Sequence, residues 1–335
     1  MPKSSAKPAG VARWTCLAWD GTGSAVRAVE VSDIAQESGP DRFLWVDVEH
    51  PGVDDTRRLG ELFGFHPLAL EDVLSNRVRP KQETYDGTLF TVMSALEPDR
   101  AGGRRVSTVT VSLFLRDRLL VTCHECPLPC VRAALKFLKE TASPGSHPPD
   151  YAYYLILDGI LDEYLTEIEA IEDEMDRIEE EVFHPRRNSD PRRTIFETRG
   201  WLSRINRSLL PKEETLRALV HRDFPQISPQ TRTLLRDVLD HVLRARDHIT
   251  ALRELITALM EAHLSRLSMR LEESMKLLSI IATLMLPLSF LTGIFGMNFE
   301  YLPGLHWRYG FAALVVFMVM LVGLMLWLFR RMRLL

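Results

Sequence analysis

A strip of small, weakly polar and apolar residues recurs near the C-terminal end of the chain at alternating intervals of three and four. The strip comprises Glu272, Met275, Ser279, Ala282, Leu286, Ser289 and Gly293. This spacing is the heptad step of helices that pack side by side in a left-handed bundle. Around a shared axis the strip would line a cation path, with apolar constrictions at Met275 and Leu286. Plain helix–helix packing and a solvated Glu272 are the alternative interpretation.

Carboxylates continue upstream of the strip. Glu254 and Glu261 are seven residues apart and therefore share a helical face. Around an axis such a face becomes a set of carboxylate rings, whereas on a single helix it is a solvated surface. A second segment, 162–181, holds 11 carboxylates and one arginine, and we expect it to be exposed. It would attract cations or a basic ring.

The four cysteines allow one candidate metal site. Cys123, His124, Cys126 and Cys130 have a spacing compatible with zinc ligands, and ordinary buried or loop cysteines are the alternative. Four cysteines in 335 residues are too few for a disulfide scaffold. The N-terminal sequence MPKSSAKPAGVARW has no apolar run and predicts no signal peptide, so we expect the soluble part in a reducing cytoplasm.

The sequence contains no sign of nucleotide-driven or hydrolytic chemistry. The phosphate-binding pattern G-x-x-x-x-G-K-[ST] is absent, and no Ser/His/Asp or H-E-x-x-H arrangement stands out. We therefore predict a protein that is not an enzyme, uses no nucleotide and transports passively. The net charge of −4 gives no electrostatic footprint for nucleic acid.

The strip must be carried by an unusually long helix. Between Pro229 and Pro287 there is neither glycine nor proline, and 57 helical residues would extend roughly 85 Å. Residues 277–295 and 310–329 contain no charged side chain. Each segment covers roughly 30 Å, the thickness of a bilayer core. We predict two transmembrane helices in a lipid bilayer, joined by a loop at 296–309.

Basic residues set the predicted topology. Lys276 precedes the first span, and Arg330, Arg331 and Arg333 follow the second. The connecting loop has one arginine and one glutamate. This bias predicts that both termini lie in the cytoplasm and the loop outside.

The residues before the long helix predict an α/β domain followed by helices. Strand-like runs occupy 13–18, 25–31, 43–48, 89–95, 107–115 and 119–123, and helices are predicted at 54–63, 67–74, 150–182 and 192–221. Pro211 should bend or divide the last of these. The predicted domains are a disordered N-terminus at 1–10, an α/β domain at 11–145, an acidic helical region at 146–228, a stalk at 229–276, the two spans with their loop, and a basic tail at 330–335.

Several motifs together resemble the CorA family of divalent metal-ion transporters. Gly296, Met297 and Asn298 stand between the two spans, in FLTGIFGMNFEYLPGLHWRYGF after MKLLSIIATLMLPLSF. The run HPLALEDVL at 66–74, the run EIEAIEDEMDRIEEEV at 167–182 and Arg236-Asp237-Val238 extend the resemblance over nearly the whole chain. It implies a funnel-shaped homopentamer in a bacterial inner membrane. The long helix would form the stalk and the pore-lining span, and the second span would form the outer ring.

The resemblance also implies roles for single residues. Asn298, with Gly296 and Met297, would form a selectivity filter whose five amide carbonyls accept hydrogen bonds from a hydrated ion. Asp72 and Asp237 match carboxylates that bind a regulatory metal between subunits, and Glu261 matches an acidic position in the stalk pore. Lys276 and the terminal arginines would form a basic ring.

Departures from the family pattern leave the ion open. The loop reads Leu-Pro-Gly-Leu at 302–305 where Met-Pro-Glu-Leu is usual, and Glu272 replaces a frequent asparagine. The Leu-Pro-Gly run, which is followed by an aromatic-rich start to the second span, resembles the zinc-transporting ZntB branch. The strip has no His or Cys, the ligands that Zn²⁺ prefers, which favours Mg²⁺ and Co²⁺, with Ni²⁺ of similar hydrated size. A ZntB-like Zn²⁺ transporter, with or without proton coupling, is one alternative, and a membrane-tethered scaffold or sensor is another.

Overall fold

The computed structural model divides the chain into two compact units. They are Met1–Leu259 and Met260–Leu335, and one helix runs from the first into the second. The structure describes residues 12–20, 26–34, 42–75, 78–97, 107–141, 147–184, 190–297, 307 and 309–331. The predicted N-terminal tail at 1–10 lies outside these residues.

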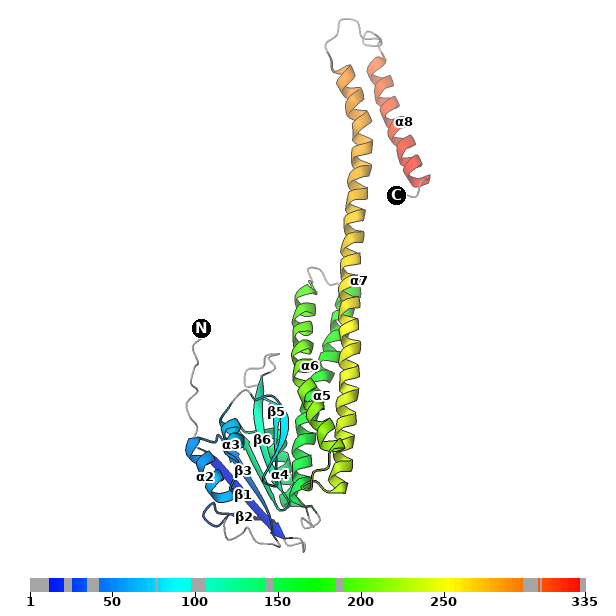
Figure 1. Ribbon diagram of the computed structural model, residues 1–335. Coiled ribbons are helices and arrows are strands. Elements are labelled where there is room, and N and C mark those ends of the chain that lie inside the picture. Colours follow the sequence, from blue (N-terminus) through cyan, green and yellow to red (C-terminus); the bar gives the residue numbers. More distant parts are fainter. Residues whose placement is uncertain are drawn as a thin grey trace. The chain divides into compact units, whose positions relative to one another are not determined.

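The first unit is built on a seven-stranded sheet (Figure 1). Its strands are β1 (Arg13–Asp20), β2 (Arg27–Val29), β3 (Arg42–Glu49), β4 (Lys81–Tyr85), β5 (Thr88–Leu96), β6 (Thr108–Arg116) and β7 (Leu119–His124). The order is β2-β1-β3-β7-β6-β5-β4, and of these pairs only β3–β7 is parallel. All six predicted strands are present. The strand β4 was missed because its sequence KQETY lacks the alternating apolar pattern of a half-buried strand.

Helices cover both faces of the sheet. On one face, α2 (Val53–Phe63) and α3 (Pro67–Leu74) bury Leu59 and Val73 in a core with Val46 and Phe114 of the strands. On the other face lies α5 (Pro149–Phe183), whose Tyr153 hydroxyl is 2.9 Å from the Thr91 hydroxyl of β5. The predicted α/β domain is thus confirmed.

Helix α4 (Pro129–Glu140) was not predicted from the sequence, and it packs on α5. A Cβ atom added to Gly159 of α5 would lie 2.9 Å from the Cβ of Cys130 of α4. The two helices can approach so closely because position 159 carries no side chain.

Two predictions about the helices need correction. The acidic segment at 162–181 is exposed on one side only, because Tyr164, Ile168 and Ile171 recur at helical spacing and are buried. Helix α6 (Arg192–His221) continues through Pro211, so the predicted division is wrong, whereas the predicted bend stays a prediction. A proline removes one hydrogen bond of the helix, and buried neighbours such as Leu209 and Leu216 hold both flanks in place.

The long helix α7 (Pro229–Phe295) has 67 residues and continues through Pro287. Within the first unit it buries a stripe that includes Leu235, Val242 and Ile249. His248 Nδ1 lies 2.9 Å from Glu172 Oε1 of α5, and Arg246 pairs with Glu213 of α6. A polar contact and an ion pair, as well as apolar packing, therefore join α7 to the helices beside it.

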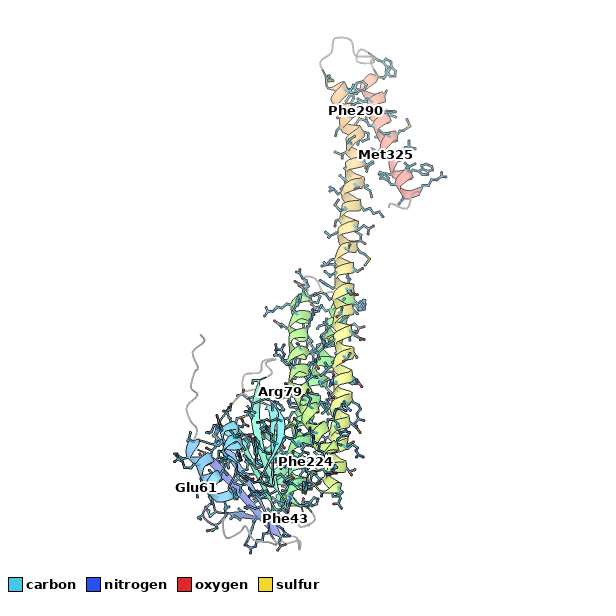
Figure 2. The ribbon with its side chains drawn as sticks, viewed as in Figure 1. Phe43, Glu61, Arg79, Phe224, Phe290 and Met325 are labelled. Carbon is cyan, nitrogen blue, oxygen red and sulfur yellow. The ribbon has the colours of Figure 1, made fainter. Side chains whose placement is uncertain are left out.

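The second unit contains the end of α7 and helix α8 (Gly310–Arg331). Both helices are long and apolar enough to cross a membrane, and their most apolar stretches are not buried within the chain. Phe329 is the one buried side chain among the described residues of this unit. Figure 2 shows the side chains of Phe290 on α7, which belongs to this apolar surface, and of Met325 on α8, which is half-buried. So large an exposed apolar surface is typical of a lipid contact or of a subunit interface.

Candidate functional site

The predicted strip lies on an uncovered face of α7. All seven of its residues, from Glu272 to Gly293, are exposed. A different face of α7 is half-buried and includes Ile280, Leu284, Leu288, Leu291 and Ile294. At about 100° per residue these two faces point roughly 150° apart.

Helix α8 has a matching half-buried face. It includes Leu314, Met318, Leu321 and Met325 and ends at the buried Phe329. Figure 1 shows α8 running back beside α7, and we infer that the half-buried residues of both helices face each other along a seam. The strip therefore faces away from α8, and among the described residues of the second unit no helix covers it.

The stalk carboxylates share the face of the strip. Glu261 and Glu272 are both exposed. They are eleven residues apart, which is close to three full helical turns, so their side chains point in nearly the same direction. Glu273, the neighbouring carboxylate, is also exposed but is rotated by about 100° towards the seam.

The first two residues of the Gly-Met-Asn motif form the C-terminal cap of α7. The Gly296 N–H donates to the Thr292 carbonyl at 2.9 Å, and the Met297 N–H donates to the Ile294 carbonyl at 3.3 Å. A Cβ atom at Gly296 would lie 3.0 Å from the Thr292 carbonyl oxygen, which favours glycine at this position. The cap also places the negative end of the helix dipole beside the motif. Asn298 lies outside the described residues.

The basic residues lie at the opposite end of the spans from the motif. Lys276, Arg330 and Arg331 are exposed, and the Arg331 guanidinium lies 5.4 Å from the centre of the Trp327 ring. Because α7 and α8 run in opposite directions, Lys276 and the two arginines stand at the same end of the hairpin. Arg333 lies outside the described residues.

The predicted regulatory carboxylate Asp72 already has a cationic partner. It lies in the last turn of α3, and its Oδ2 is 2.8 Å from Lys81 Nζ. The same ammonium is 2.8 Å from Glu83 Oε2. Although partial burial lowers the pKa of Lys81, hydrogen bonds to Asp72 and Glu83 outweigh that effect and raise it. The hydrogen bond from Lys81 lowers the pKa of Glu83.

Asp237, the second predicted regulatory carboxylate, is exposed on α7. Its Oδ2 lies 3.7 Å from Nε2 of His241, one helical turn further on. Within the described part of the chain, no hydrogen bond or ion pair joins Asp237 to Asp72. A metal ion held by both carboxylates would need them to come from different chains or a different arrangement of this one.

The four predicted zinc ligands do not come together. Cys123 and His124 are neighbours on β7 and point to opposite faces of the sheet. Cys123 lies in the core beneath α2 and α3, where burial raises its pKa. Over the described ranges, no group of three His, Cys, Asp or Glu side chains is arranged to hold a metal. The zinc interpretation is wrong because strand alternation separates residues that are adjacent in sequence, and the alternative of ordinary buried or loop cysteines is confirmed.

His124 instead belongs to a buried polar network that the sequence did not reveal. Its Nε2 lies 3.0 Å from Asp47 Oδ1 of β3, and its Nδ1 lies 2.6 Å from the Cys126 carbonyl. Burial lowers the pKa of His124, but the contacts with Asp47 outweigh it and raise the pKa overall. Thr122 donates to the same Asp47 oxygen and accepts from the Trp45 indole at 3.1 Å. This network joins β3 to β7.

Lys212 of α6 is a second buried polar centre that sequence reasoning missed. Its Nζ lies 2.7 Å from Ser94 Oγ of β5, 2.9 Å from the Tyr164 hydroxyl of α5 and 2.9 Å from the Ser208 carbonyl. Burial lowers its pKa well below the ordinary value. The amine thus ties α5 and α6 to the sheet by hydrogen bonds.

A sheet domain, a 67-residue helix and two candidate spans define a class of membrane protein with a large soluble body and a C-terminal helical hairpin. The family model described as CorA-like Mg2+ transporter protein matches residues 40–331. The chain belongs to this family of metal ion transporters.

Relatives within the family are named for the transport of different metal ions. The cobalt/magnesium transport protein CorA of Thermotoga maritima is 32% identical over 281 residues, which cover 83% of this chain and 79% of the relative. The zinc transport protein ZntB of Enterobacter sp. is 25% identical over 317 residues, which cover 93% of each chain.

Solved structures share the fold. CorA of Methanocaldococcus jannaschii superposes with a TM-score of 0.77 at 22% identity, covering 94% of this chain and 97% of the other. The full-length CmaX protein gives 0.77 at 23% identity, covering 95% and 97%. The predicted combination of an α/β domain, a long helix and two C-terminal apolar helices is thus confirmed.

Proposed function

We propose that this chain forms a passive, channel-like transporter of divalent metal cations in a bacterial inner membrane, as a funnel-shaped homopentamer with both termini in the cytoplasm. The observation that carries the proposal is the exposed strip on α7, which points away from α8. Two helices of one hairpin touch along one seam and enclose no water path. Several copies around an axis, with α7 inside and α8 outside, bring the strips together.

The strip suits a hydrated divalent cation. Glu261 and Glu272 would attract the ion to the axis, and the small side chains of Ser279, Ala282 and Gly293 would leave room for bound water. At the external mouth, Asn298 would present neutral amide oxygens that accept hydrogen bonds from that water. A doubly charged ion gains roughly 4.6 kcal/mol per 100 mV of inside-negative potential, so no nucleotide is required.

Mg²⁺ and Co²⁺, with Ni²⁺, are the ions that we favour. The strip contains no His or Cys, which Zn²⁺ prefers, and the Thermotoga maritima relative at 32% identity is named a cobalt/magnesium transport protein. The second candidate is Zn²⁺ transport, with or without proton coupling. It is supported by the match to a zinc transport protein along 93% of both chains.

Asp72 and Asp237 are the proposed regulatory carboxylates. Both are reachable by solvent, and each faces a cationic or titratable side chain of its own chain. In the pentamer a divalent ion held between subunits at these positions would keep the pore shut when internal metal is abundant. Asp72→Ala or Asp237→Ala should therefore weaken closure by internal Mg²⁺. Inhibition equal to that of the unchanged protein would place regulation elsewhere.

Flux into proteoliposomes tests the proposal. Purified protein is supplied in turn with Mg²⁺, Co²⁺, Ni²⁺ and Zn²⁺ under imposed pH gradients, and Asn298→Ala is compared in parallel. We expect flux of Mg²⁺ and Co²⁺ that Asn298→Ala abolishes while the oligomer stays intact. Zn²⁺ flux that follows the pH gradient would favour the second candidate. Absence of flux for every ion would instead support a membrane-tethered scaffold or sensor.

A further inference from the structure

Lys81 occupies a place where a metal ion would otherwise be attracted. Its Nζ lies 2.8 Å from Asp72 Oδ2 and 2.8 Å from Glu83 Oε2, so one ammonium bridges two carboxylates from different elements. The side chains of Lys81, Asp72 and Glu83 are 34%, 25% and 38% exposed. A cation from solution can therefore reach the two carboxylates, and Lys81 stands between them.

The fold favours a positive charge between Asp72 and Glu83. Asp72 lies in the last turn of α3, where the helix dipole is negative and disfavours a carboxylate. Lys81, Glu83 and Tyr85 alternate along β4 and therefore share one face of the strand. The Tyr85 hydroxyl donates to Glu83 Oε2 at 2.9 Å and holds that carboxylate in position. Two carboxylates and a helix C-terminus thus converge on one ammonium.

We infer that Lys81 is a tethered counter-cation that competes with a divalent metal ion for Asp72 and so sets the metal concentration at which the regulatory site fills. This inference rests on the regulatory role proposed above for Asp72. A divalent ion that binds Asp72 must displace the ammonium of Lys81. The measured affinity for the metal is therefore lower than the intrinsic affinity of the site, because part of the binding free energy is used to break the Lys81 contacts.

The expected size of the effect follows from the exposure of the three side chains. Partly exposed ion pairs change an equilibrium constant by up to about fivefold, and here one ammonium serves two carboxylates. Removal of the ammonium should lower the midpoint of metal binding about fivefold, which corresponds to about 1 kcal/mol. The shift should be confined to the binding that depends on Asp72.

Calorimetric titration of the full-length protein in detergent with Co²⁺ tests the inference. Lys81→Met and Lys81→Gln remove the charge, and Lys81→Arg keeps it. Arg79→Met is the matched control. Arg79, labelled in Figure 2, is two residues away and pairs with Glu214 at 2.9 Å near the surface, with both side chains 70% exposed. Asp72→Asn identifies the binding that depends on that carboxylate.

We expect the Co²⁺ midpoint to fall about fivefold in Lys81→Met and Lys81→Gln and to stay unchanged in Lys81→Arg and Arg79→Met. Asp72→Asn should weaken binding. A midpoint that does not move in the two neutral Lys81 variants, or that moves equally in Arg79→Met, would overturn the role of Lys81 alone. If Asp72→Asn leaves Co²⁺ binding unaltered, the proposed regulatory site fails, and the inference fails with it.

Discussion

Glu163 of α5 should make the stability of the first unit depend on pH near neutrality. Its side chain is half-buried, and one carboxylate oxygen, Oε1, has no hydrogen-bond partner among the residues that the structure describes. Burial raises the pKa of Glu163 to about 7, and a hydrogen bond from the Cys130 backbone opposes the rise only in part. The fold thus favours the protonated, neutral form of this carboxyl group.

The sign of the pH dependence follows from that raised pKa. In the unfolded chain the pKa is near 4.5, so the folded state binds the proton more tightly. The contribution of Glu163 to stability is complete below about pH 4.5 and is lost as the pH rises through about 7. After a discount for the part of the side chain that water reaches, the loss amounts to about 1–2 kcal/mol.

Urea unfolding of the full-length protein in detergent, followed by tryptophan fluorescence at pH 5 and pH 8, measures this loss. Glu163→Gln should reduce the difference in unfolding free energy between the two pH values by about 1–2 kcal/mol, because the amide stays neutral throughout. The control Glu169→Gln changes an exposed carboxylate on the same helix and should keep the original difference. An identical pH dependence in Glu163→Gln and the unchanged protein would refute the reasoning.

Two further pairs of variants test the helix contact and the strip. Gly159→Ala should destabilise the first unit by about 1–2 kcal/mol, because the clash with Cys130 exceeds the gain in helix propensity. The control Gly200→Ala should stabilise the unit by about 0.5–1 kcal/mol. Equal shifts of the thermal midpoint in both variants would contradict the close approach of α4 and α5. Glu272→Gln should alter the ion preference of flux into proteoliposomes, whereas the control Glu273→Gln should leave it unchanged. A change of preference in Glu273→Gln alone would assign the ion path to another face of α7.

Regular features of the sequence predicted the parts of the fold that hydrophobic periodicity controls. The six apolar strands, the helix without glycine or proline and the two uncharged spans were all found. The strand β4 was missed because backbone pairing with β5 holds its polar sequence in place. An edge strand of this kind depends on its neighbour more than on its own composition.

The polar centres could not be predicted because their partners come from distant parts of the chain. The Lys212 amine meets Ser94, which is 118 positions away, and His124 meets Asp47, which is 77 positions away. Nothing in the local sequence of α6 or β7 marks these side chains as buried. For the strip, by contrast, the spacing alone predicted one shared face, because all its residues belong to one continuous helix.

Accessibility of single cysteines along α7 in the membrane tests most directly whether the strip lines a water path. Cysteine is introduced at Ser279, Ala282 and Ser289 of the strip and at Leu284 and Leu288 of the seam, and a charged, water-soluble thiol reagent is applied. We predict rapid labelling at the three strip positions, slow labelling at the two seam positions, and protection of the strip by Co²⁺. Labelling at the seam positions without labelling at the strip positions, or equal labelling rates on both faces, would contradict the account.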